Sequence, residues 1–302
     1  MKVIIVGMGV QGNKRAIIAR KDLVATVDIK KKANFKNIKD IKKNTYDTVI
    51  LCVPDDQKLK LIEYCYRYKK NVLVEKPLVS KNIKDLENLK KKFKKNKLIL
   101  YTAYNHRFEP HFIRMKKLIN KKTLGKIYSC RMFYGNGTAK LVKNSKWRDT
   151  KSGVINDLGS HLLDTCLFWF GKKKIKDFKI SSFSKFENNA PDHVSIISKN
   201  SNLLLQLEAT LCMWKNHFTC DILAEKGSAH ISSLCKWDVT KFILRKRKFP
   251  SGRPKEKIFS IKSQDPTWNL EYKFFKKICK NKKFNSLEND IWIQKKINNL
   301  YK

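Results

Sequence analysis

Two short stretches of this 302-residue chain carry side chains whose types and spacing could perform proton transfer. The first is Glu75-Lys76-Pro77, where the lysine ammonium could hydrogen-bond a substrate hydroxyl and lower the pKa of a neighbouring alcohol or histidine. The second, Asp157 to Asp164, holds His161 one helical turn after Asp157. Histidine titrates near neutrality, so it could take a hydroxyl proton while a hydride leaves carbon and the carboxylate orients the histidine or a second hydroxyl. Taken alone, Asp157 and His161 fit equally well a helix cap with a histidine whose hydrogen bonds are made within the fold. Lys76 could likewise be an ordinary surface lysine.

A hydride needs an acceptor, and the start of the chain has the pattern of a dinucleotide-binding turn. Val3 to Val6 form a continuous β-branched run, typical of a parallel strand that is buried on both faces. Gly7, Gly9 and Gly12 follow in the spacing G-x-G-x-x-G. In this motif the glycines permit a tight turn, a close approach to a pyrophosphate and close packing of helix against strand.

An acidic residue at the end of a second strand supports this interpretation. The apolar run Leu23 to Val27 ends at Asp28, about 20 residues after the glycines, where a carboxylate could accept hydrogen bonds from the adenosine ribose. An aspartate there repels a 2′-phosphate and therefore favours NAD over NADP. Lys30, Lys31 and Lys32 could soften that preference, so NADP stays open.

Alternating strands and helices position these residues. Further apolar strands are predicted at Thr48 to Val53, Asn71 to Val74 and Leu98 to Thr102, with helices from Asp56 to Lys69 and after Ser80, which we expect to cap its helix. Such alternation predicts a doubly wound parallel sheet, whose ligands bind at the carboxyl ends of the strands. The residues expected to bind the cofactor at that rim are Gly7, Met8, Gly9, Val10, Gly12, Asp28, Val53, Pro54, Glu75, Lys76 and Asn105.

The second half of the chain has a different construction. After about residue 124 the apolar residues alternate with period two, which predicts strands at 126–134, 178–186, 194–198, 203–214, 217–224 and 228–233. Helices are predicted at Leu158 to Phe170, Trp268 to Cys279 and Leu287 to Leu300, the last capped by Ser286. The predicted fold class is α/β: a Rossmann domain over residues 1–120, and an α+β substrate-binding and oligomerisation domain with an open, mainly antiparallel sheet over 121–302.

Composition narrows the remaining classes of function. The net charge of +41 suggests nucleic-acid binding, but the excess is lysine spread evenly along the chain, which an AT-rich coding bias would also produce. We therefore expect no specific nucleic-acid partner. No apolar run approaches the ~18 residues of a membrane span, and the eight dispersed cysteines resemble reduced core residues, so we expect a cytoplasmic protein. The histidines and cysteines lack metal-ligand spacing, and no metal is expected.

Taken together, these motifs resemble those of the glucose-fructose oxidoreductase and inositol dehydrogenase family (Gfo/Idh/MocA) over nearly the whole chain. The resemblance rests on the three glycines, Asp28, Glu75-Lys76-Pro77, Tyr104-Asn105-His106-Arg107-Phe108, Trp147-Arg148 and the stretch from Asp157 to Asp164. It implies that Lys76, Asp157 and His161 are active-site residues and that the open sheet builds an oligomer interface. The residues expected to bind substrate are Lys76, Asn105, Arg107, Trp147, Arg148, Asp157 and His161.

The chain departs from the family pattern at two places on the substrate side. Only Gly153 remains of a glycine-rich run before the aspartate, and Lys58 replaces a common histidine. The function expected from the resemblance is NAD(P)-dependent hydride transfer to or from a sugar, polyol or nucleotide sugar, in a homodimer or homotetramer. The alternative is a regulator of the same fold that binds nicotinamide cofactor without turnover.

Overall fold

The computed structural model describes residues 1–145, 148–150, 152–198, 202–282, 284 and 287–301. The chain divides into two compact units. The first unit comprises Met1–Asn105 and Thr267–Gln294, and the second comprises His106–Pro266 and Lys295–Lys302. The sequence predicts one boundary between domains, at residue 120. The compact units divide the chain elsewhere, because the helix that follows His106 belongs to the second unit and the chain returns to the first unit at Thr267.

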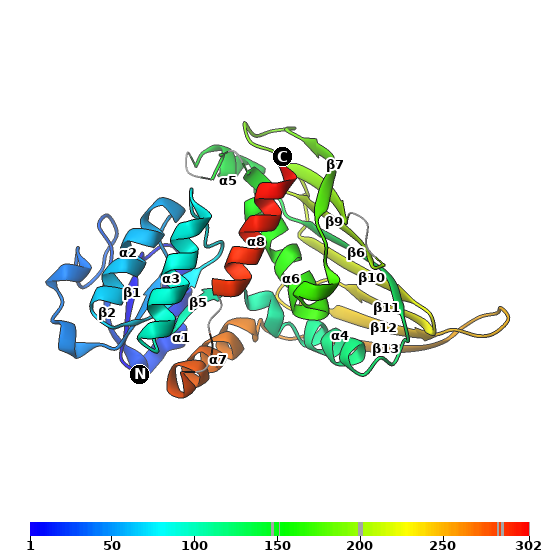
Figure 1. Cartoon of the computed structure of the whole chain (residues 1–302), viewed down its shortest axis with the longest axis horizontal. Coiled ribbons are helices and arrows are strands. Elements are labelled where there is room, and N and C mark those ends of the chain that lie inside the picture. The colour runs from blue at the N-terminus through cyan, green and yellow to red at the C-terminus, as the bar shows by residue number, and fades with distance from the viewer. Residues whose placement is uncertain (146–147, 151, 199–201, 283, 285–286, 302) are drawn as a thin grey trace. The chain divides into compact units, whose positions relative to one another are not determined.

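The first unit is built on a five-stranded parallel sheet in the order β2-β1-β3-β4-β5. Figure 1 labels β1, β2 and β5 of this sheet. The strands are β1 (Val3–Val6), β2 (Leu23–Val27), β3 (Thr48–Leu51), β4 (Asn71–Glu75) and β5 (Leu100–Ala103). The helices are α1 (Val10–Ala19), α2 (Asp55–Arg67), α3 (Ile83–Lys95) and α7 (Thr267–Asn281), with α8 (Leu287–Leu300) beginning here. The predicted doubly wound sheet is confirmed.

Alternate side chains of β1, β3, β4 and β5 pack into separate cores on the two faces of this sheet. Val3 and Ile5 pack with Phe275 of α7, whereas Ile4 and Val6 belong to the core that α2, α3 and the start of α8 complete. A parallel strand can read as a continuous apolar run only when both faces are covered. The α7 helix, some 160 residues after β5, supplies part of that cover.

Most strands and helices of this unit lie where the sequence predicts them. The crossover after β2 contains a bridge between Val27 and Phe35 and two 3₁₀ turns, Ile38–Asp40 and Lys43–Thr45. The predicted cap of α3 was wrong. Asn82 caps the helix by accepting a hydrogen bond from the Lys84 backbone N–H, while the Ser80 hydroxyl donates to Asp85. Ser80 and Asn82 are both residue types that cap helices, and α3 begins after Asn82.

The second unit is built on an eight-stranded sheet in the order β13-β12-β11-β10-β6-β9-β8-β7, antiparallel except where β6 pairs with β9. The strands are β6 (Ile127–Gly135), β7 (Phe178–Ser184), β8 (His193–Ser198), β9 (Leu204–Thr210), β10 (His217–Ala224), β11 (Gly227–Ser232), β12 (Thr240–Lys246) and β13 (Lys255–Ile261). The helices are α4 (Pro110–Asn120), α5 (Ala139–Lys143) and α6 (Ser160–Phe170), which follows a π-helical turn over Ile155–Gly159, with 3₁₀ turns at Asn105–Phe108 and Lys172–Lys174.

The predicted mainly antiparallel sheet is confirmed, although β12 and β13 were not predicted because their lysines and arginines obscure the alternation. On the covered face Cys130, Met132 and Tyr134 are buried. The period-two alternation predicted for 126–134 would put Tyr128 on that face as well, yet Tyr128 is 46% exposed. It lies in a bulge, since Ser129 pairs with Leu223 while Ile127 pairs with Ala224.

The predicted cap Ser286 lies outside the described residues. Within the described part of the chain, no helix is long and apolar enough to cross a membrane.

Candidate functional site

The turn between β1 and α1 has the geometry that the glycine spacing predicted. Gly7 has φ +94°, and a Cβ there would lie 2.3 Å from the Cys52 carbonyl oxygen. A Cβ on Gly12 would lie 1.9 Å from the Gly7 carbonyl oxygen, so only glycine allows the helix to approach the strand this closely. A Cβ on Gly9 would meet nothing within 4 Å. Gly9 therefore leaves open space at the N-terminus of α1, the kind of position at which proteins bind phosphate groups.

Asp28 connects the end of β2 to this turn. One carboxylate oxygen accepts a hydrogen bond from the Met8 backbone N–H at 2.7 Å, and the other accepts from the backbone N–H groups of Lys30 and Lys31, each at 2.8 Å. Burial alone would raise the pKa of Asp28, but these three donors lower it below its ordinary value. The carboxylate therefore stays charged beside the glycine turn. Recognition of the adenosine ribose by Asp28 remains a prediction from the sequence.

Lys76 directly follows β4, and the preceding Glu75 is fixed by a buried arginine that the sequence analysis missed. Arg15 Nε lies 2.7 Å from Glu75 Oε1, and Arg15 Nη2 lies 2.7 Å from Glu271 Oε2 on α7. Burial alone would lower the pKa of Arg15, but the two carboxylates raise it. Of the other predicted cofactor residues, Pro54 precedes α2 as its N-cap, and Val53 Cγ1 would lie 3.1 Å from a Cβ on Gly7.

In the second unit His161 lies in the first turn of α6 and is 6% exposed. Its ring stacks on that of His106, with centroids 4.0 Å apart, and contacts Tyr134 edge to face. The preceding Ile155–Gly159 segment is π-helical, a feature often found at functional sites. The regular helical spacing inferred for Asp157 and His161 therefore applies only approximately.

Three of the remaining residues predicted to bind substrate, Arg148, Arg107 and Asn105, make ion pairs or hydrogen bonds within their own units. Arg148 Nη2 lies 2.7 Å from Asp157 Oδ2. Arg107 binds the buried Asp164 through two nitrogens, at 2.7 and 2.5 Å. Asn105 donates to the hydroxyl of Thr267 at 2.9 Å. These contacts give Arg107 and Asn105 a structural role that the sequence did not reveal, and Trp147 lies outside the described residues.

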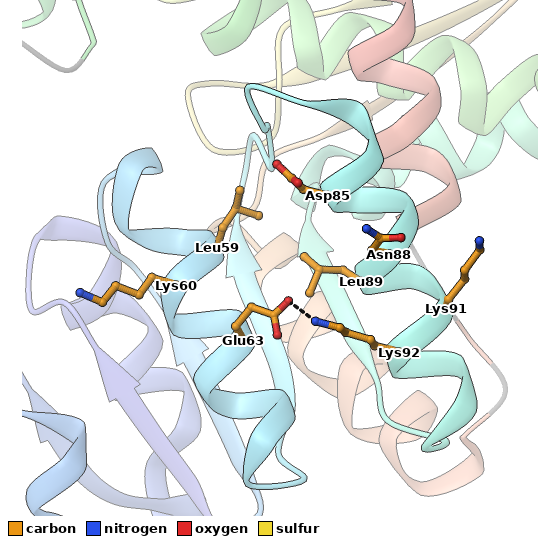
Figure 2. Close-up of a pocket in the computed structure, with 8 residues that line it drawn as sticks. All are labelled: Leu59, Lys60, Glu63, Asp85, Asn88, Leu89, Lys91 and Lys92. Atoms are coloured by element: carbon orange, nitrogen blue, oxygen red, sulfur yellow. Dashed lines mark hydrogen bonds and ion pairs between the residues drawn. The ribbon is translucent and has the colours of Figure 1, made fainter.

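A groove of about 580 Å³ lies between α2 and α3. Figure 2 shows the side chains that line it. Its lining residues are Leu59, Lys60, Glu63, Asp85, Asn88, Leu89, Lys91 and Lys92. It contains none of the predicted site residues, and an ion pair between Lys92 and Glu63 spans it. Because doubly wound sheets bind their ligands at the carboxyl ends of the strands, we do not assign the cofactor to this groove. Among the residues that the structure describes, no group of three His, Cys, Asp or Glu side chains could hold a metal ion.

Comparison with known proteins identifies the family. Residues 1–104 match an oxidoreductase family described as an NAD-binding Rossmann fold, and residues 112–230 match the GFO/IDH/MocA C-terminal domain. The chain belongs to the GFO/IDH/MocA family. The two matches fall on either side of the boundary between the units at Asn105 and His106. The NAD-binding character of the first unit, predicted from its glycines, is confirmed.

Individual relatives of this GFO/IDH/MocA chain are distant. It is 28% identical over 131 residues to the scyllo-inositol 2-dehydrogenase (NADP⁺) of Bacillus subtilis strain 168, a match covering 42% of this chain and 36% of that protein. It is 34% identical over 86 residues to the myo-inositol 2-dehydrogenase of Thermotoga maritima, covering 28% and 25%. Levoglucosan dehydrogenase in complex with NADH has a similar fold, with TM-score 0.83, 16% identity, and coverage of 99% and 96%. The chain thus aligns with well under half the length of the two inositol dehydrogenases.

The glycine turn, Asp28 and Lys76 were predicted as site residues from the sequence, but the side chains that contact this region were not. One signal was present for Arg15: it falls between Gly12 and Ala19 on the buried stripe of α1, an unusual place for a charge. His106 had a weaker signal, because it lies in the Tyr104–Phe108 motif that carried the family resemblance. Glu271 had no local signal, since it lies on a helix far along the chain.

Proposed function

We propose that this GFO/IDH/MocA protein transfers a hydride between a nicotinamide cofactor and a carbon that bears a hydroxyl in a sugar, a polyol or a sugar joined to a nucleotide. The main support is the turn at Gly9, where open space at the start of α1 lies beside the charged Asp28. These residues fit a dinucleotide pyrophosphate and ribose. The names of the relatives, two inositol dehydrogenases and a levoglucosan dehydrogenase, agree with a polyhydroxylated substrate.

In this proposal three side chains act on the substrate. A bound nicotinamide supplies the hydride acceptor in oxidation and the hydride donor in reduction. During oxidation His161 takes the hydroxyl proton as the carbonyl forms, and it returns that proton in reduction. Lys76 donates a hydrogen bond to the reacting oxygen. Asp157, held by Arg148, orients His161 or a second hydroxyl of the substrate.

The cofactor preference and assembly belong to the same proposal. Asp28 favours NAD because its charge repels a 2′-phosphate, although the Bacillus relative is named for NADP⁺. We also propose that the protein forms a homodimer or homotetramer through the open face of the second unit's sheet, and that it acts in the cytoplasm without a specific nucleic-acid partner. No finding supports the alternative of a regulator without turnover.

A screen of the purified protein tests the proposal. Nicotinamide absorbance should change when NAD or NADP is mixed with members of a panel of inositols, aldoses and nucleotide sugars. A substrate-dependent change that disappears in Lys76→Ala and in His161→Asn is the expected result. Tight NAD binding without turnover of any panel member in either direction would favour the regulator.

A further inference from the structure

Lys58 of α2 is almost completely buried, yet every hydrogen of its ammonium group has an acceptor. Its side chain is 2% exposed, and Nζ donates to the carbonyl oxygens of Glu75 at 2.6 Å and Pro77 at 2.7 Å. The third acceptor is Asp55 Oδ1, at 2.7 Å. Burying a charge is costly unless it is paired and hydrogen-bonded, and these three contacts satisfy that requirement.

The two carbonyl acceptors belong to the residues on either side of Lys76. Lys58 therefore holds the backbone both before and after the lysine that we propose acts on substrate. Arg15 of α1 separately holds the side chain of Glu75 through a contact of 2.7 Å. Two buried cations from two helices thus fix the Glu75-Lys76-Pro77 segment, one through its backbone and the other through its acidic side chain.

We propose that Lys58 is a positioning residue that sets the location of the Lys76 ammonium for hydride transfer. The inference rests on the proposed function of Lys76. Only a charged, fully protonated lysine has the three N–H groups that these acceptors require, and a neutral amine has two. Burial lowers the pKa of Lys58 and Asp55 opposes that effect, so Asp55 helps to keep the ammonium charged. In this chain a lysine thus holds a position where the family commonly has a histidine.

Lys70 provides a matched control within the same unit. It is also a buried lysine, 9% exposed, and its Nζ donates to two backbone carbonyls, those of Lys43 at 2.6 Å and Tyr46 at 2.7 Å. Lys70 directly precedes β4, whereas Lys76 follows that strand at the opposite end. Removing either ammonium deprives two carbonyls of a donor, but only the loss of Lys58 affects the backbone around Lys76.

The experiment compares Lys58→Met and Lys70→Met with the wild type and with Lys76→Ala. Misplacement of a catalytic group by about 1 Å can cost 10²-fold, so we expect Lys58→Met to lower kcat by about 10- to 100-fold. We expect Lys70→Met to retain kcat even where both variants lose similar stability to urea. Hydrogen exchange of a peptide covering Val74 to Val79 should become faster in Lys58→Met and not in Lys70→Met. Lys58→Gln, which keeps two N–H donors, should give an intermediate kcat and takes the place of the methionine variant if that one does not fold.

The outcomes separate this inference from the proposed function. If Lys76→Ala slows turnover while Lys58→Met and Lys58→Gln keep wild-type kcat, Lys58 does not position Lys76 and the proposed function stands. If Lys76→Ala retains full turnover, the role assigned to Lys76 is wrong. If hydrogen exchange of the peptide from Val74 to Val79 is unchanged in Lys58→Met, Lys58 does not restrain the backbone around Lys76. An equal fall of kcat in Lys58→Met and Lys70→Met would show a general loss of stability and overturn the proposal.

Discussion

His106 and His161 stack with their ring centroids 4.0 Å apart and their planes inclined by 20°. His106 is itself buried, at 2% exposure, and its Nε2 lies 3.4 Å from Lys236 Nζ. A rigid aromatic neighbour restricts the plane in which the His161 imidazole can lie. A proton acceptor works best when its orientation is fixed before the substrate arrives, so this contact suits the role proposed for His161.

Replacement of His161 by asparagine should slow turnover by about 10²- to 10⁴-fold, the usual scale for a positioned general acid/base. Asparagine has similar polarity but cannot accept a proton near neutral pH. The Kd for NAD should barely change, because the glycine turn and Asp28 lie in the first unit. Steady-state kinetics and a fluorescence titration measure the two quantities, with His193→Asn on β8 as a control. Full activity of His161→Asn at neutral pH would remove the histidine from the mechanism.

Gly9 and Gly12 should respond differently to the same change. Gly9→Ala adds a methyl group to open space, so the protein should fold normally while its affinity for NAD falls roughly tenfold or more, about 1.4 kcal/mol. Gly12→Ala forces a methyl group to within 1.9 Å of a backbone oxygen and should lower the free energy of unfolding by about 2 kcal/mol or more. Urea unfolding and NAD titration of both variants test this. Normal NAD binding by Gly9→Ala would argue against a pyrophosphate at that position.

Asp28 should control the choice between NAD and NADP. In Asp28→Ser the charge that repels a 2′-phosphate is removed, while the hydroxyl can still accept a hydrogen bond from the Met8 N–H. We expect the ratio of the two Kd values to move towards NADP. We also expect Asp28→Ala to bind both cofactors more weakly than Asp28→Ser, because the alanine leaves the turn without that acceptor. A wild-type preference for NADP, or an unchanged ratio in both variants, would contradict the assignment.

Glu271 should make stability depend on pH. Burial raises its pKa from 4.5 to about 7, although Arg15 opposes this effect. As the pH rises through that interval, the unfolded chain loses its proton first, so the folded protein loses stability. Glu271→Gln should reduce the loss of unfolding free energy between roughly pH 5 and pH 8, by an amount on the order of 3 kcal/mol at most. Urea unfolding at both pH values measures it, with Glu63→Gln, a half-buried glutamate on α2, as control. An identical pH dependence in Glu271→Gln and wild type would contradict the prediction.

The open face of the second unit's sheet should mediate self-association. Leu204, Leu223 and Ile258 lie on this face and are 39%, 50% and 57% exposed. Exposed apolar side chains on a sheet face favour a partner surface, and we expect an interface above roughly 1,000 Å². Leu223→Asp should shift the mass measured by light scattering towards the monomer, whereas Leu141→Asp on α5 should not. A wild-type protein that is monomeric at micromolar concentration would refute this assembly.

The sequence alone determined the features that depend on neighbouring residues. Glycine spacing, a strand that ends in Asp28 and apolar runs of fixed period are local properties, because turns and regular elements impose them over a few residues. The cofactor turn, the parallel sheet and most strands of the second sheet were therefore predictable. The cap at Ser80 was wrong because Asn82, two residues later, could also cap the helix, and Tyr128 was misplaced because a bulge interrupts the alternation of β6.

Only the tertiary structure decided which groups hold the candidate site. Arg15 reaches Glu75 across 60 positions and Glu271 across 256, and Lys58 reaches the carbonyl oxygens of Glu75 and Pro77 from another helix. No local pattern encodes such pairs, because their geometry arises when strands and helices pack together. A buried charge is stable only where it is paired and hydrogen-bonded, and Arg15 and Lys58 take most of their partners from distant segments, so their roles become visible once those segments have come together.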